Sequence, residues 1–173
     1  MTTAWVGILA AISFATEHIE NENRTGAIPL LDQVRGQNSY YPGRDIFVVR
    51  DAHHWTQVWR ATYGGASTGT PVANIAIPPV PPIEFRKYMV LAVMGGEVSE
   101  TGDYRYVGGS FRGKNSVLRV DFVPYRGPLR IQARPYAFFM IPRLEGRVSI
   151  QMPDQRSGQW RDLTSVELPS LGD

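Results

Sequence analysis

Residues 88–111, YMVLAVMGGEVSETGDYRYVGGSF, contain the part of the sequence that decides the fold. Residues 88–95 are almost continuously apolar, which is typical of a strand that is covered on both faces. Residues 104–111 combine aromatic and β-branched residues and predict a second strand. A glycine-rich, acidic segment separates these two runs, and it could either bind a phosphate or connect two strands.

The glycine-rich segment 95–109 lacks the features of a phosphate-binding loop. It contains neither G-x-G-x-x-G nor G-x-x-x-x-G-K-[ST], and a strand rather than a helix is predicted after it. Glu97, Glu100 and Asp103 would repel a phosphate. The segment is therefore predicted to connect two strands.

Three glycines and one aspartate suggest the local geometry of this connection. Gly102 and Asp103 are predicted at its turn, because both residue types tolerate positive φ. Gly108 and Gly109 are predicted to form a β-bulge or a place where another backbone comes close.

Further strands are predicted on both sides of this region. In residues 117–123 polar and apolar residues alternate, so Leu118, Val120 and Phe122 are expected on the buried face. The other predicted strands are 46–50, 136–141 and 147–152.

The segment DAHHWTQVWRATYGG (51–65) predicts one amphipathic helix, about 51–63. Asp51 is a good N-cap, and Gly64 and Gly65 would end the helix in the left-handed conformation. The apolar face, which we expect to pack on the sheet, consists of Ala52, Trp55, Val58, Trp59, Thr62 and Tyr63.

The proline-rich stretch NIAIPPVPPIEF (74–85) follows the helix. Its four prolines cannot donate to a sheet ladder, so we interpret it as a stiff connection. The alternative is a ligand for proline-reading domains.

Together these patterns predict a β-rich α+β fold, with a mostly antiparallel, sandwich-like core and one main helix. The β-rich domain is expected to span 46–152. It would follow a linker at 17–45, with one short strand or turn around residues 28–34, and precede a tail at 153–173 that docks in part through Trp160.

The first 16 residues contain an uncharged, mostly apolar run, AWVGILAAISFAT (4–16). As a helix it would reach only ~20 Å, short of the ~30 Å hydrocarbon core. Its length suits a secretory signal, and residues 13–15 resemble a cleavage site, although no Lys or Arg precedes Arg24. The alternative is a retained segment that docks on the domain, a partner or a membrane interface. We therefore expect a periplasmic, extracellular or membrane-associated location.

The composition excludes several functions. A net charge of +2, from 18 basic and 16 acidic residues, does not indicate a basic surface that would bind nucleic acid. The absence of cysteine excludes disulfides, thiolate metal sites and cysteine nucleophiles. His53 and His54 are adjacent on the predicted helix and cannot share a metal ion as an i, i+4 pair can. With no G-x-S-x-G elbow either, we expect no metal, no cofactor and no enzymatic activity.

The order of four motifs, over about 46–142, resembles the C-terminal domain of PrcB-like proteins. These motifs are DAHHWTQVW (51–59), FRKYMVLAVMGG (85–96), TGDY (101–104) and RPYAFFMIP (134–142). PrcB-like proteins are envelope proteins named for an accessory subunit of a bacterial surface protease complex. The sequence departs from the family pattern at Glu84, a different acidic residue, and at Asp103, which replaces a glycine. The resemblance implies a non-catalytic accessory subunit that binds a larger protein complex.

Two segments are the best candidates for binding a partner, because aromatic residues and arginine on loops fixed by a sheet are typical of interface hot spots. They comprise Thr101, Gly102, Asp103, Tyr104, Arg134, Pro135 and Tyr136. The alternative is a structural role, in which Pro135 fixes the start of a strand and the two tyrosines pack with their hydroxyls at the rim.

A protease inhibitor is the alternative function. T-G-D-Y and R-P-Y resemble the T-G-Y and R-P-W loops of the chagasin-type, immunoglobulin-like inhibitors of cysteine proteases. The helix predicted at 51–63 has no obvious place in that sandwich.

Overall fold

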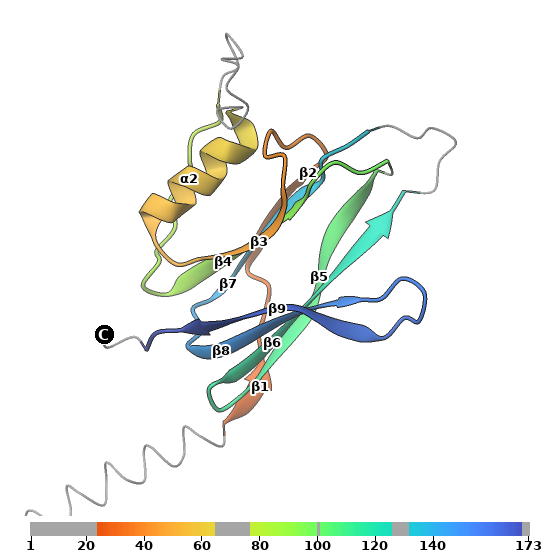
Figure 1. Cartoon of the computed structure of the whole chain (residues 1–173). Coiled ribbons are helices and arrows are strands. Elements are labelled where there is room, and N and C mark those ends of the chain that lie inside the picture. Colours follow the sequence, from red (N-terminus) through yellow and green to blue (C-terminus); the bar gives the residue numbers. More distant parts are fainter. Residues whose placement is uncertain (1–23, 65–76, 100, 126–131, 171–173) are drawn as a thin grey trace, which may run out of the picture.

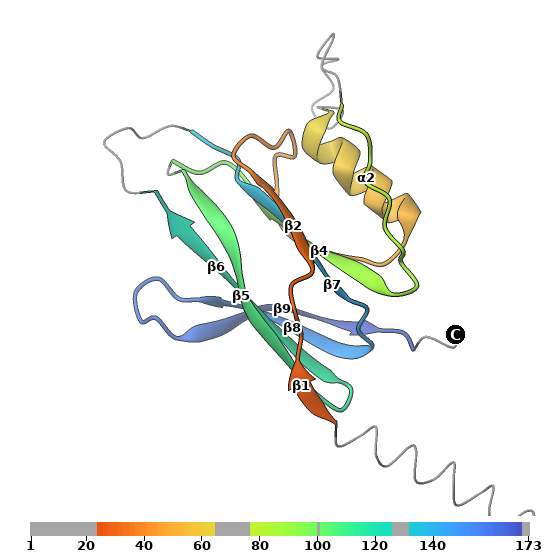
Figure 2. The same cartoon turned by 180° about the vertical axis from the view of Figure 1, so that it is seen from behind.

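A computed structural model describes residues 24–64, 77–99, 101–125 and 132–170. Two β-sheets stack on each other, and one helix, α2 (Ala52–Tyr63), covers the outer face of the smaller sheet (Figure 1). Seen from behind, α2 and the larger sheet lie on opposite sides of the smaller sheet (Figure 2). The fold therefore has three layers.

The smaller sheet has the strand order β2–β7–β4–β3, and the larger sheet has the order β1–β5–β6–β8–β9. All strand pairs are antiparallel except β6 with β8. This arrangement confirms the predicted β-rich α+β fold with a sandwich-like core. The strands are Thr25–Ala27 (β1), Asp32–Gly36 (β2), Arg44–Val49 (β3), Tyr88–Gly95 (β4), Gly102–Arg112 (β5), Asn115–Pro124 (β6), Tyr136–Pro142 (β7), Gly146–Pro153 (β8) and Trp160–Leu168 (β9).

Strand β4 is apolar throughout because it lies in the middle layer. Met89 and Leu91 face the core between the two sheets, whereas Val90 and Ala92 face the core beneath α2. All four side chains are at most 1% exposed. The prediction of a strand covered on both faces is confirmed. The alternation predicted for 117–123 is confirmed as well, since the side chains on its apolar face pack into the core between the sheets.

Helix α2 begins where the sequence predicts. Asp51 is its N-cap, and the Asp51 carboxylate accepts a hydrogen bond from the His54 N–H at 2.8 Å. Trp55 and Trp59 are 3% and 4% exposed, which confirms that they pack in the core. The predicted left-handed end is wrong at Gly64, whose φ is −104°. Glycine is needed there for space instead, because a Cβ would lie 2.7 Å from the carbonyl oxygen of Arg60.

The described part of the proline-rich stretch runs along α2 and returns the chain to β4. The indole N–H of Trp55 donates to the carbonyl of Pro81 at 3.0 Å, and that of Trp59 donates to Pro78 at 2.9 Å. Both buried indole donors are thereby satisfied. The interpretation of the stretch as a connection agrees with this path.

The linker and the tail predicted at 17–45 and 153–173 differ from the structure. The described part of the predicted linker contains β1, which pairs with β5, and β2, which pairs with β7. Much of the predicted tail forms β9, which pairs with β8. Each of these strands lies at the edge of its sheet and is mostly exposed, so its sequence is polar and gives a weak strand signal. Residues 1–23, with the apolar run at 4–16, lie outside the described residues.

The predicted turn at Gly102 and Asp103 is wrong. Both residues lie within β5, where Gly102 pairs with Pro124 of β6. The chain leaves β4 at Gly96, whose φ is +62°, and crosses from one sheet to the other before β5 begins. Gly and Asp favour a turn, but they do not distinguish a hairpin from a crossover between sheets.

The predicted bulge at the next pair of glycines is confirmed. Tyr106 pairs with Val120 and Gly108 pairs with Arg119, so Val107 is the extra residue of the bulge. The carbonyl of Gly109 accepts a hydrogen bond from the N–H of Ile28 at 2.8 Å, which is the close backbone approach.

Candidate functional site

The two segments predicted to bind a partner meet at one end of the sandwich, and Gln37 joins them. The Gln37 side chain donates to the carbonyl of Gly102 at 2.6 Å and accepts from its N–H at 3.3 Å. The backbone carbonyl of Gln37 accepts from the N–H of Arg134 at 2.8 Å. No local pattern predicts this role, because Gln37 lies in the polar segment predicted as a linker.

The side chains of the seven predicted residues differ in their access to a partner. Gly102, Tyr104, Pro135 and Tyr136 are buried, as the structural alternative expects of the two tyrosines and the proline. Thr101, Asp103 and Arg134 are partly exposed.

The two partly exposed charged residues are both engaged within the chain. Asp103 forms an ion pair with Arg35 at 3.6 Å and accepts a hydrogen bond from the hydroxyl of Tyr125. Arg134 forms an ion pair with Glu97 at 3.2 Å.

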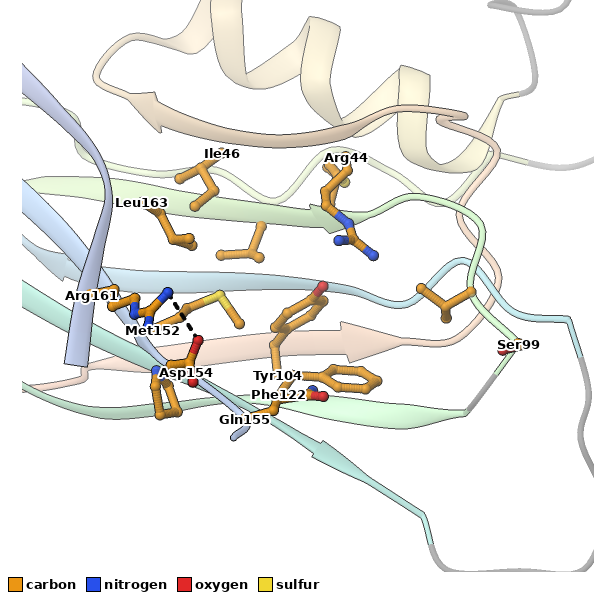
Figure 3. Close-up of a pocket in the computed structure, with 14 residues that line it drawn as sticks. Arg44, Ile46, Ser99, Tyr104, Phe122, Met152, Asp154, Gln155, Arg161 and Leu163 are labelled. Atoms are coloured by element: carbon orange, nitrogen blue, oxygen red, sulfur yellow. Dashed lines mark ion pairs between the residues drawn. The ribbon is translucent and has the colours of Figure 1, made fainter. Parts of the chain in front are cut away.

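A groove of about 530 Å³ opens beside these segments, between the two sheets (Figure 3). We call it the inter-sheet groove. It lies at the side of the sandwich where β3 and β9 form the edges of their sheets. Its lining comprises Arg44, Ile46, Val93, Met94, Val98, Ser99, Tyr104, Phe122, Met152, Pro153, Asp154, Gln155, Arg161 and Leu163.

A β-bulge places an apolar side chain at the mouth of the inter-sheet groove. Thr164 pairs with Ile150 and Asp162 pairs with Gln151, so Leu163 is the extra residue in β9. Leu163 is 52% exposed. Bulges at sheet edges commonly redirect a side chain next to a functional site.

The polar lining of the groove includes Arg44 and Tyr104, and both lie against Gly95. The Nε of Arg44 donates to the carbonyl of Gly95 at 3.1 Å, which holds the guanidinium at the groove. Tyr104 is only 6% exposed, and its hydroxyl end points toward Arg44 (Figure 3). A Cβ on Gly95 would lie 2.7 Å from that hydroxyl oxygen, so glycine is needed there. Burial raises the pKa of Tyr104, and the charge of Arg44 opposes the rise.

The turn between β8 and β9 fixes the other end of the groove. The carboxylate of Asp154 accepts from the Ser157 N–H at 2.9 Å, from the Ser157 hydroxyl at 3.0 Å and from the Arg156 N–H at 3.1 Å. Asp154 also forms an ion pair with Arg161 at 3.1 Å (Figure 3). The hydrogen bonds from Ser157 lower the pKa of Asp154. This carboxylate is therefore already satisfied within the chain.

The residues with the potential for metal or acid–base chemistry are dispersed over the described chain. Within it, no group of three or more His, Asp or Glu side chains could hold a metal ion. His53 is exposed and contacts Gln57, and His54 lies edge-on to the ring of Phe47. No helix in the described ranges is both long enough and apolar enough to span a membrane.

Comparison of the chain with protein-family models, with curated proteins and with solved structures gave no match.

Proposed function

We propose that this chain is a non-catalytic protein-interaction module, an accessory or stabilising subunit of a larger protein complex in the cell envelope. We further propose that it binds its partner through the inter-sheet groove. The observation that carries the proposal is a partly apolar groove between the two sheets whose edge strands, β3 and β9, have no further strand beside them among the described residues. An extended segment can pair with such an edge and place alternate side chains in the groove.

The envelope location and the role as a subunit rest on the resemblance to PrcB-like proteins over 46–142. The partly exposed residues Thr101, Asp103 and Arg134 lie at the adjacent end of the sandwich, and we assign them to the rim of the partner contact. The buried members of the two segments support this rim from beneath. A retained apolar run at 4–16 would add a membrane contact.

Co-purification of the tagged full-length chain from its native source tests the proposal. Leu163→Asp puts a charge at the groove mouth, and we expect it to abolish recovery of the large complex. Val107→Asp is the matched control, because Val107 is also an exposed bulge residue, is 55% exposed, and does not line the groove. It should leave recovery unchanged. A free monomer in the wild type, or equal effects of both variants, would contradict the proposal.

One observation favours protease inhibition as a second candidate function: Gln37 brings the T-G-D-Y and R-P-Y segments to the same end of the sandwich. An assay with papain distinguishes the two functions. Inhibition at nanomolar concentration would favour the inhibitor, whereas its absence, together with recovery of a large complex, would favour the subunit.

A further inference from the structure

We propose that the inter-sheet groove binds an extended, acidic segment of the partner protein, and that Arg44 and Tyr104 bind a side-chain carboxylate of that segment. This inference rests on the proposed function and specifies the chemistry of the partner. It is carried by the position of the Tyr104 hydroxyl, the charge of Arg44 and the apolar surroundings of both groups.

The hydroxyl of Tyr104 is a hydrogen-bond donor that lies beside Arg44 at the groove. Tyr104 is more than nine-tenths buried, and its hydroxyl has no hydrogen-bond partner among the described residues. It differs in this from Tyr106, whose hydroxyl donates to the carbonyl of Ile28 at 2.8 Å, and from Tyr136, whose hydroxyl donates to that of Tyr63 at 2.7 Å. The hydroxyl oxygen itself is not a fully buried unpaired atom, because the buried polar side-chain atoms without a partner in the described chain are Nε of Arg50 and Nε of Arg143. It faces the groove beside Arg44 as an available donor, and a ligand in the groove that accepts a hydrogen bond can pair with it.

The charges at the groove favour a ligand that is negatively charged. Arg44 uses Nε to bind Gly95, and the rest of its guanidinium, toward which Tyr104 points, retains further donors (Figure 3). The second arginine of the lining, Arg161, is already paired with Asp154. A tyrosine hydroxyl is protonated at neutral pH, and the raised pKa of Tyr104 leaves this unchanged, so the hydroxyl can donate. A carboxylate accepts from both groups, and such charge-assisted hydrogen bonds are stronger than neutral ones.

The surroundings of this donor pair favour a side-chain carboxylate on an extended segment. Ile46 and Leu163 line the same groove on opposite edge strands, and Phe122 packs against Tyr104 with a ring-centroid distance of 5.1 Å. A strand that pairs with an open edge directs alternate side chains to one face. Apolar residues two positions before and after an acidic residue would therefore reach the apolar lining while the carboxylate reaches Arg44.

Peptide titration of the full-length chain carrying ¹³C-labelled tyrosine tests this assignment. The first probe is a capped peptide of alternating valine and threonine in which the central valine is replaced by glutamate. The second has glutamine at that position, and the third is the glutamine peptide with a free C-terminal carboxylate. We expect saturable shifts of the Tyr104 ring signals with the glutamate peptide and about tenfold weaker binding of the other two peptides.

Two variants of groove residues and one control variant test whether Tyr104 and Arg44 bind the carboxylate of the peptide. Tyr104→Phe and Arg44→Gln should each weaken binding of the glutamate peptide about tenfold. Tyr104→Phe removes a hydroxyl without a partner among the described residues, so its unfolding midpoint should match the wild type and show that the fold is intact. Tyr106→Phe removes a hydroxyl whose hydrogen-bond partner, Ile28, does not line the groove, and should bind the peptide as the wild type does.

Three results would overturn the inference: equal affinity for the glutamate and glutamine peptides, wild-type affinity in both groove variants, or no saturable shift of the Tyr104 signals. Co-purification separates this failure from that of the proposed function. If Leu163→Asp abolishes recovery of the complex but Tyr104→Phe and Arg44→Gln do not, the groove binds a partner without a carboxylate. If Leu163→Asp has no effect, the proposed function itself fails.

Discussion

Gln37 and Gly102 are joined by two hydrogen bonds between one side-chain amide and one residue's backbone. The Nε2 of Gln37 donates to the carbonyl of Gly102 at 2.6 Å, and its Oε1 accepts from the N–H of Gly102 at 3.3 Å. The same Nε2 also donates to the Asp103 carboxylate at 3.0 Å. This contact attaches the start of β5 to the segment after β2, and thus one sheet to the other.

Gln37→Glu should destabilise the chain by about 1–3 kcal/mol at pH 7. The new carboxylate loses the donor and faces the Gly102 carbonyl and the Asp103 carboxylate. Because protonation restores a donor, much of the lost stability should return near pH 4, about the ordinary pKa of a glutamate. Urea unfolding at both pH values measures the effect.

Gln33→Glu is the matched control for this change, since Gln33 is exposed on β2 and its side chain carries no comparable contact. It should alter the unfolding free energy by less than about 0.5 kcal/mol. Equal destabilisation by the two substitutions at pH 7 would show that the Gln37–Gly102 contact contributes no more to the unfolding free energy than an exposed glutamine does.

Gly95→Ala should destabilise the fold by about 1–3 kcal/mol through overpacking. The added Cβ would lie 2.7 Å from the Tyr104 hydroxyl oxygen and 2.8 Å from Cγ of Pro135. Guanidinium unfolding measures the loss, and the Tyr104 ring signals should shift because the hydroxyl must move. A more stable variant, or unchanged Tyr104 signals, would contradict this account of the close approach.

The pH dependence of stability should change in Tyr106→Phe. Burial raises the pKa of Tyr106 from 10.0 to about 12, so the folded chain resists ionisation that the unfolded chain allows. The stabilisation is complete below pH 10 and is lost as the pH rises through about 12. Between these values the unfolding free energy should fall less steeply in the variant than in the wild type.

The test of Tyr106→Phe compares the slopes of the two curves of unfolding free energy against pH, not their absolute values. The substitution also removes the hydrogen bond to Ile28, which lowers stability by a constant amount at every pH below 10. Burial likewise raises the pKa values of Tyr63 and Tyr104, but these two tyrosines are present in both chains and cancel. Parallel curves for the variant and the wild type between pH 10 and about 12 would contradict the prediction.

The elements that could be predicted from the sequence are those whose own residues, by being apolar or by their spacing, indicate that they are buried. Strand β4 is apolar at every position because both faces are covered, and the tryptophans of α2 repeat at helical spacing. The edge strands β1 and β9 could not be predicted, and β2 only as a short strand or turn around residues 28–34, because their neighbours supply the hydrogen bonds and most of their side chains are exposed.

The inter-sheet groove depends on relationships that no local pattern contains. The sequence predicts Tyr104 as a candidate site residue, but Arg44, toward which its hydroxyl end points, lies in the predicted linker. Leu163 reaches the groove mouth only because a register shift in β9 makes it an extra residue, and that shift is defined by the pairing with β8. Contacts between strands distant in sequence therefore decide which residues line the groove.

Trp59→Phe should lower the unfolding free energy by about 2 kcal/mol. The smaller ring fills less of the core beneath α2, and the carbonyl of Pro78 loses the indole N–H that it accepts at 2.9 Å. Trp160→Phe is the matched control, since Trp160 is only half-buried and stacks with the guanidinium of Arg119 at 5.3 Å, a contact worth about 0.5–1 kcal/mol at an exposed site. Guanidinium unfolding should rank the two losses in this order. The reverse order would contradict the larger contribution of Trp59, in the core beneath α2, to the unfolding free energy.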